Sequence, residues 1–169
     1  MPTVRLSFTP AAAHVRTARL VGVAVARRAG VAAELFDEIR LAIGEACSRA
    51  VALHREHNIP DLVEVALEDE DRFTVRVTDR APIDAALGPA LPDISDPVAL
   101  LDDPVTPGNS DPAGEEAVAV GMRLALLIGI VDDLSVRPAE AGPGTEVLMS
   151  WPTRYGRNGA GGARMAGSR

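Results

Sequence analysis

Residues 62–79 read LVEVALEDEDRFTVRVTD, and this stretch decides the fold. Its two ends, residues 62–67 and 73–78, alternate apolar and polar side chains with a period of two, which is typical of strands that bury one face. The polar letters EDEDR between them suit a turn. The stretch therefore predicts a β-hairpin with one buried face.

Helical spacing precedes the hairpin. Apolar residues recur at helical intervals over residues 11–29, and Gly30 ends the pattern. A second helix is predicted over residues 33–57, where one apolar stripe runs the whole length before Asn58. Ahead of both helices, VRLSF at residues 4–8 alternates as an edge strand would. The first half of the chain therefore predicts the order β-α-α-β-β.

The second half begins with an irregular segment. Residues 80–116 are rich in proline and acidic side chains, which predicts a flexible lid loop. Residues 117–134 are apolar nearly all round and predict a helix buried against a sheet. Residues 134–138 and 145–151 then predict a final hairpin. The whole order predicts a two-layer α+β sandwich, with helices on one face of a mixed or antiparallel sheet.

The domain is predicted to span residues 1–151, followed by a disordered tail rich in glycine and arginine over residues 152–169. The net charge of −7, without a local basic face, argues against direct binding of nucleic acid. A single cysteine excludes an internal disulfide, and no apolar run approaches the roughly 20 residues of a membrane span. No signal peptide is visible, so we expect a cytoplasmic protein.

The second predicted helix contains GEACSRAV at residues 44–51. Glu45 and Arg49 lie four positions apart and therefore share one helix face. From the residues alone, the pair is either an ordinary surface ion pair or the remnant of an active site. His54 and His57, near the end of the same helix, are close enough in sequence to share a metal, although a structural or exposed role is the favoured interpretation.

Several motifs occur in a characteristic order: EAC followed by AV on the helix, V-T-D at the end of the hairpin, a long loop, a helix that begins with glycine, and G-T-E-V-x-M on the last strand. In this order the chain, over residues 4–151, resembles the anti-sigma-factor serine kinases of the GHKL ATPase superfamily, which have the Bergerat fold. The resemblance implies a histidine-kinase-like ATPase domain, with ATP as cofactor and Glu45 as the catalytic general base.

The resemblance also assigns the nucleotide site. Arg49 stands where the family has an asparagine that binds magnesium, and a guanidinium has no lone pair for a cation, so magnesium is doubtful here. Arg49 would pair with Glu45 or approach a phosphate directly. Asp79 matches the aspartate that accepts from the adenine amino group, whereas Ala81 and Ile83 replace the glycines that follow it.

Two further motifs complete the implied site. Gly121 matches the first glycine at the entry of the next helix, and Arg123 replaces the second. Gly144 and Thr145 match the motif before the last strand. Each also has an ordinary structural interpretation, since Asp79 would suit the end of a strand and both glycines would suit a helix entry or a turn.

The implied function is regulation of transcription. The resemblance places a partner-binding surface at Arg16 and Arg19, with a sigma factor and/or an anti-anti-sigma antagonist as partner, and implies a homodimer. We expect an anti-sigma-type regulator whose serine kinase activity is weakened or lost. The alternatives are an active serine kinase dependent on ATP and magnesium, and a sensor of another small ligand in the same fold.

Overall fold

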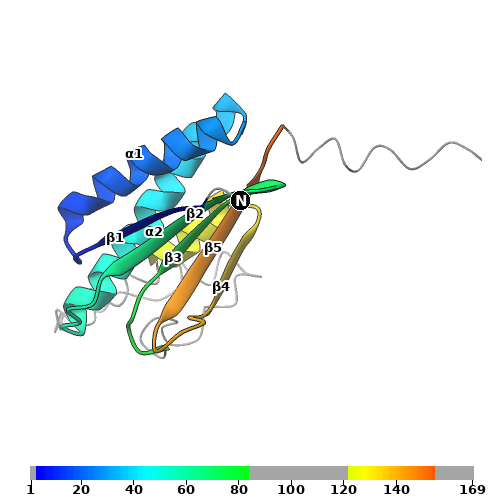
Figure 1. Cartoon of the computed structure of the whole chain (residues 1–169). Coiled ribbons are helices and arrows are strands. Elements are labelled where there is room, and N and C mark those ends of the chain that lie inside the picture. The colour runs from blue at the N-terminus through cyan, green and yellow to red at the C-terminus, as the bar shows by residue number, and fades with distance from the viewer. Residues whose placement is uncertain (1–2, 84–121, 155–169) are drawn as a thin grey trace, which may run out of the picture.

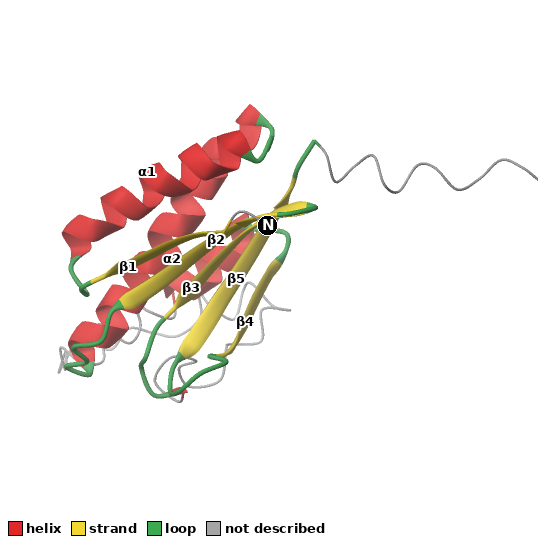
Figure 2. Ribbon diagram, in the orientation of Figure 1, coloured by secondary structure: helices red, strands yellow, loops and turns green. Residues whose placement is uncertain are grey.

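The computed structural model describes residues 3–83 and 122–154. Figures 1 and 2 show a sheet with its helices gathered on one face. The sheet has five strands in the order β1-β2-β3-β5-β4, and every neighbouring pair is antiparallel. The elements are β1 (Thr3–Phe8), α1 (Ala12–Arg28), the short 3₁₀ helix η1 (Ala33–Leu35), α2 (Phe36–Glu56), β2 (Val63–Asp69), β3 (Arg72–Thr78), a helix over residues 122–130, β4 (Leu134–Pro138) and β5 (Thr145–Pro152). The predicted two-layer α+β fold is confirmed, and the sheet is antiparallel rather than mixed.

The strands occupy their predicted places. β2 and β3 form the predicted hairpin, β4 and β5 form the second one, and β1 lies at an edge. The sequence pattern did not show that β5 inserts between β3 and β4. This arrangement pairs Thr78 with Glu146, and it thereby brings Asp79 beside Thr145. Residues from the two hairpins therefore meet at one end of the sheet.

The predicted third helix extended too far. Of its range, residues 122–130 are helical, residues 131–133 are not, and Leu134 begins β4 opposite Met149. Two consecutive aspartates at 132 and 133 favour a turn over a helix end, because their carboxylates compete for backbone groups and repel the negative end of the helix dipole. Residues 117–121 and most of the predicted lid loop lie outside the described residues.

The core lies between the sheet and the helices. The inward side chains of β2, β3 and β5 are almost completely buried, as their period of two requires. They are Val63, Val65, Leu67, Phe73, Val75, Val77, Val147, Met149 and Trp151. Against them α2 packs a stripe of Ile39, Ala42, Ile43, Ala46 and Ala50. The small alanines let α2 approach the sheet closely, so longer side chains on its inner face reach the strand ends.

The last strand continues one residue beyond residue 151, to the position where the predicted tail begins. Pro152 belongs to β5, and Thr153 forms a β-bridge with Val31. The remaining tail, residues 155–169, lies outside the described residues. Within the part of the chain that the structure describes, no helix has the length and apolar character needed to cross a membrane.

Candidate functional site

Arg49 is a buried side chain that points from α2 towards the ends of β3 and β5. Only 1% of it is exposed. Its Nη1 donates to Oδ2 of Asp79 at 3.0 Å, and its Nη2 donates to Oγ1 of Thr145 at 3.2 Å. The interpretation of Arg49 and Glu45 as a surface ion pair is therefore wrong. A long side chain on the inner edge of α2 reaches the carboxylate at the strand end, and a charge buried there requires such a partner.

Asp79 accepts four hydrogen bonds with its two carboxylate oxygens. Oδ2 accepts from Arg49 at 3.0 Å and from the Thr145 hydroxyl at 2.5 Å. Oδ1 accepts from the backbone N–H groups of Ala81 at 3.0 Å and Thr145 at 3.2 Å. Since an ionised carboxylate offers about four acceptor positions, the acceptor capacity of Asp79 is filled by the protein itself. The sequence motifs placed Arg49, Asp79 and Thr145 in one site, but they did not predict that these residues bind one another directly.

The charge of this buried network is balanced internally. Burial lowers the pKa of the Arg49 guanidinium, and the negative charge of Asp79 and the hydrogen bond to it act in the opposite direction. An arginine nonetheless keeps its proton at neutral pH. The network therefore consists of a cation and an anion, joined by a threonine hydroxyl, with both charged side chains at 1% exposure.

Gly144 is required by backbone packing at the same place. Its φ is +120°, which side chains disfavour, and a Cβ at this position would lie 1.9 Å from the carbonyl oxygen of Asp79. The close approach of this turn to the end of β3 positions the Thr145 N–H for Asp79. Backbone packing alone thus explains why residue 144 is a glycine.

Glu45 is partly exposed and is not hydrogen-bonded to Arg49 or Asp79 in the contacts of the described residues. Its Oε2 accepts a hydrogen bond from Nη1 of Arg123 at 2.9 Å, and its side chain is 22% exposed. Arg123 comes from the helix over residues 122–130, so this pair joins two helices. The carboxylate proposed as a base thus has a cation as its immediate partner. Gly121, the other residue expected at this helix entry, lies outside the described residues.

Arg19 and Arg16 lie on α1, on the other side of Glu45. Arg19 lines a small hollow of about 140 Å³ between α1 and α2, together with Glu45 and Ser48. A Cβ added at Gly44 would lie 2.9 Å from the Cδ of Arg19. The absence of a side chain at Gly44 therefore leaves room for the arginine. Arg16 is exposed. The two arginines and Glu45 therefore belong to the helical surface and not to the buried Asp79 network.

His54 is a residue of this region whose role the sequence did not reveal. The ring is fully buried, its Nε2 accepts from the backbone N–H of Arg80 at 2.9 Å, and its Nδ1 lies 3.1 Å from the carbonyl oxygen of Asp61. Because one nitrogen accepts, the other must donate to the carbonyl, which fixes a neutral ring with the proton on Nδ1. His54 thereby holds the backbone next to Asp79 against α2.

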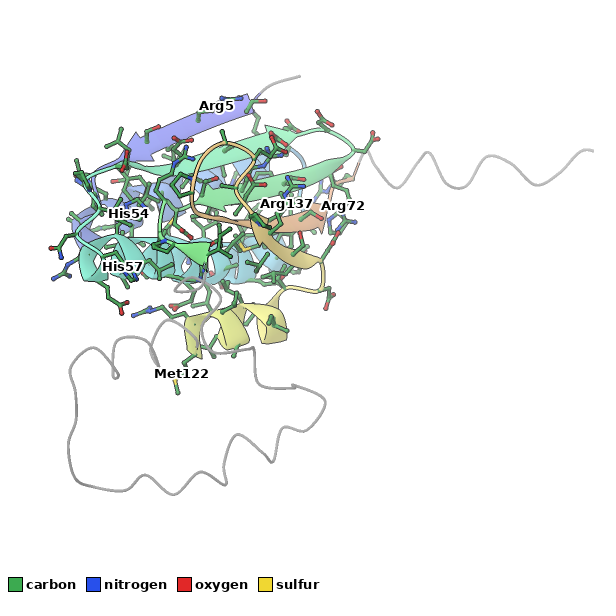
Figure 3. All side chains as sticks on the ribbon, turned by 90° about the horizontal axis from the view of Figure 1, so that it is seen from below. Arg5, His54, His57, Arg72, Met122 and Arg137 are labelled. Carbon is green, nitrogen blue, oxygen red and sulfur yellow. The ribbon has the colours of Figure 1, made fainter. Side chains whose placement is uncertain are left out.

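His57, by contrast, is exposed at the end of the same helix, and Figure 3 shows both histidines at one end of the molecule. No group of three potential metal ligands occurs among the side chains that the structure describes.

The site residues that lie within the described ranges do not fit the nucleotide and metal that the resemblance implied. Arg49 offers no lone pair to magnesium. An adenine amino group would need a free acceptor on Asp79, and its acceptor positions are occupied by Arg49, Thr145 and Ala81. Ala81 itself is fully buried beside Leu53. ATP would therefore have to displace protein groups from this site before it could be recognised there.

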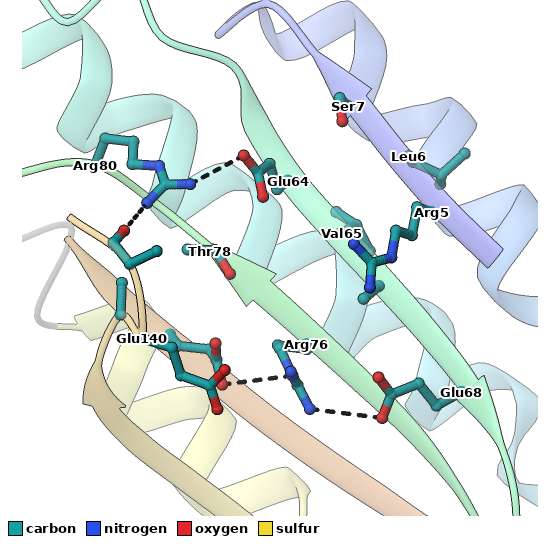
Figure 4. A pocket seen from close by; sticks show the side chains of 14 residues that line it. Arg5, Leu6, Ser7, Glu64, Val65, Glu68, Arg76, Thr78, Arg80 and Glu140 are labelled. Carbon is teal, nitrogen blue, oxygen red and sulfur yellow. Dashed lines mark hydrogen bonds and ion pairs between the residues drawn. The ribbon is translucent and has the colours of Figure 1, made fainter. Parts of the chain in front are cut away.

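A larger hollow, of about 440 Å³, lies on the opposite face of the sheet (Figure 4). Charged side chains line it, and several of them pair with one another. Arg80 binds Glu64 at 3.0 Å, and Arg76 lies within 3.5 Å of Glu68 and 3.4 Å of Glu146. This face is a network of ion pairs directed away from the helices, and it does not include the Asp79 carboxylate.

Comparison with known proteins adds one positive finding. Residues 8–151 match the family model described as the histidine kinase-like ATPase domain. The match covers α1, α2 and both hairpins, and it contains Glu45, Arg49, Asp79 and Thr145. A search of curated proteins found no match.

Proposed function

The chain belongs to the histidine kinase-like ATPase domain family, and on that premise we propose that it is an anti-sigma-type regulator that controls transcription by binding a partner protein. The partner is a sigma factor, an anti-anti-sigma antagonist, or each in turn, in the cytoplasm. Serine kinase activity is weakened or lost. The regulator would then work through the stability of its complexes, as a homodimer, and not through phosphate transfer.

One observation supports the proposed loss of kinase activity: Arg49 and Thr145 occupy hydrogen-bond acceptor positions of the Asp79 carboxylate. Phosphoryl transfer needs a bound nucleotide and a cation to neutralise the developing charge. In this chain the residue at the expected magnesium position is itself a cation, and it is buried against the expected adenine ligand. The pairing of Glu45 with Arg123 also withdraws the proposed base from this role.

The charge of α1 supports a binding surface. This helix carries four arginines and no acidic residue, in a protein whose net charge is −7. Arg16, Arg27 and Arg28 are exposed, and so is Leu20 at 60%. Exposed arginines beside an exposed leucine suit a partner protein that presents acidic and apolar side chains. Arg16 and Arg19 remain our choice for the centre of this surface.

Two experiments test the proposal. Isothermal titration with ATP and magnesium should give no heat of binding up to millimolar concentration, whereas submicromolar or micromolar binding with transfer of phosphate to an antagonist would establish the active kinase instead.

Affinity capture from the native host should recover a sigma factor or an antagonist domain. Capture should weaken on Arg16→Glu and persist on Arg55→Glu, which changes an exposed arginine on α2. Recovery of neither class of partner would overturn the regulatory role.

A further inference from the structure

We propose that Arg49 is a built-in ligand of its own domain: its guanidinium permanently occupies the Asp79–Thr145 site, and the site is selective for planar guanidinium or amidinium cations. This proposal rests on the proposed loss of nucleotide binding. It concerns which group occupies the site, whereas the proposed function concerns which protein the domain binds.

The geometry of the contacts supports a ligand-like role. Two nitrogens of one planar group donate to two different acceptors, Asp79 Oδ2 at 3.0 Å and Thr145 Oγ1 at 3.2 Å. The Thr145 hydroxyl in turn donates to Asp79 Oδ2 at 2.5 Å. A fork of donors in a fixed plane matches this arrangement, whereas an ammonium group presents a point charge without that shape.

The acceptors are fixed independently of Arg49. Asp79 Oδ1 is held by the backbone N–H groups of Ala81 and Thr145, and the Asp79 backbone N–H donates to the Thr145 carbonyl at 3.0 Å. Gly144 lets the turn approach closely, and His54 holds the adjacent Arg80 N–H. Removal of the arginine side chain would therefore leave a preorganised anionic site and not a collapsed one. Such a site should bind the missing fragment from solution.

Truncation with chemical rescue tests this directly. Arg49→Ala removes the atoms of an ethylguanidinium ion, so ethylguanidinium is the probe. We expect the truncation to lower the thermal midpoint by about 10 °C, because it leaves the Asp79 charge buried without its cation. Low-millimolar ethylguanidinium should restore most of that loss. Ethylurea, a neutral molecule of the same shape, and ethylammonium, a cation without the planar fork, should not.

Three controls make the result specific. Arg40→Ala, which removes an exposed arginine of the same helix, should neither lower the midpoint appreciably nor respond to the probe. The probe should have no effect on the unsubstituted protein, whose site is filled. It should also fail with Arg49→Ala combined with Asp79→Asn, since the anion is then absent. Equal responses to ethylguanidinium and ethylurea, or a response that survives Asp79→Asn, would overturn the proposal.

If Arg49→Ala does not fold unaided, the same three compounds are added during refolding. Recovery of the circular dichroism signal with ethylguanidinium alone supports the inference, and recovery with none of them contradicts it. The two proposals fail in different ways. Nucleotide binding by the unsubstituted protein would overturn the occupancy of the site by Arg49, whereas capture of no partner would overturn the regulatory role and leave the rescue result intact.

Discussion

At the scale of single residues, the structure separates side chains that the sequence had grouped together. Glu45 and Arg49 lie on neighbouring turns of α2, yet Glu45 pairs with Arg123 at a partly exposed position and Arg49 pairs with Asp79 at a buried one. The i,i+4 rule gives the face of a helix but not the reach of a long side chain. The partner of Arg49 depends on where the end of β3 lies, and no local pattern in the sequence contains that information.

Cys47 illustrates how burial sets reactivity. The thiol is fully buried, and desolvation raises its pKa to about 12. We predict that it resists alkylation by iodoacetamide at pH 8 in the native protein and reacts rapidly in denaturant, as measured by mass spectrometry. Ser135→Cys in a Cys47→Ala background, which places a thiol at an exposed position, is the control and should label at once. Fast labelling of native Cys47 would show that α2 opens locally.

The same pKa has a consequence for stability. Above a pH of about 8.5 the unfolded chain releases the Cys47 proton, whereas the folded chain holds it up to about 12. The unfolded state then binds fewer protons, so this group lowers the free energy of unfolding as the pH rises through that window. Cys47→Ala should reduce the alkaline loss of stability, which denaturant titrations at pH 8 and pH 10 would measure.

At the scale of elements, the link between α2 and the end of β3 depends on His54. Replacement by alanine removes the acceptor for the Arg80 N–H and leaves a cavity, so we expect a loss of about 2–4 kcal/mol. His57→Ala, at the exposed end of the same helix, should stay within about 0.5 kcal/mol of the unsubstituted protein. Urea denaturation would compare the two. Equal effects would mean that His54 contributes no more than a surface residue.

The turn before β5 gives a second matched pair. Gly144→Ala places a Cβ against the Asp79 backbone at a φ of +120°, and we expect it to destabilise the protein by about 3 kcal/mol or more. Gly129→Ala should stabilise it by up to about 1 kcal/mol, because that glycine is helical and no heavy atom lies within 4 Å of an added Cβ. Thermal unfolding of both variants checks the contrast, and a neutral Gly144→Ala would refute the packing explanation.

At the scale of the whole molecule, Trp151 joins the two layers. Its Nε1 donates to Oε1 of Glu38 at 2.6 Å, and its ring packs against Phe73. Glu38→Ala should cost about 1–2 kcal/mol, since the buried indole N–H loses its acceptor. Asp37→Ala, which alters a surface pair with Arg40, should cost less than about 0.5 kcal/mol. The single tryptophan reports both unfolding transitions by its fluorescence, and equal midpoints for the two variants would contradict this role.

The layered fold could be predicted from the sequence, because alternating and helical spacing give each element its type and buried face. The order of the elements then left few ways to combine them. The strand order β3-β5-β4 could not be predicted, since both hairpins have the same local pattern in any arrangement. The candidate site could be predicted from the sequence only in part, for the same reason. Motifs placed Asp79 and Thr145 in one region, but their direct contact depends on a pairing between strands that are far apart in the chain.

The contact between Arg49 and Asp79 has an evolutionary consequence. Loss of Arg49 alone leaves a buried anion without its partner, and loss of Asp79 alone leaves a buried cation without its partner. Each single change is therefore expected to destabilise the fold strongly. Only a joint exchange avoids both penalties. The two positions are therefore epistatic. A chain that holds this pair is therefore expected to keep both residues or to exchange both.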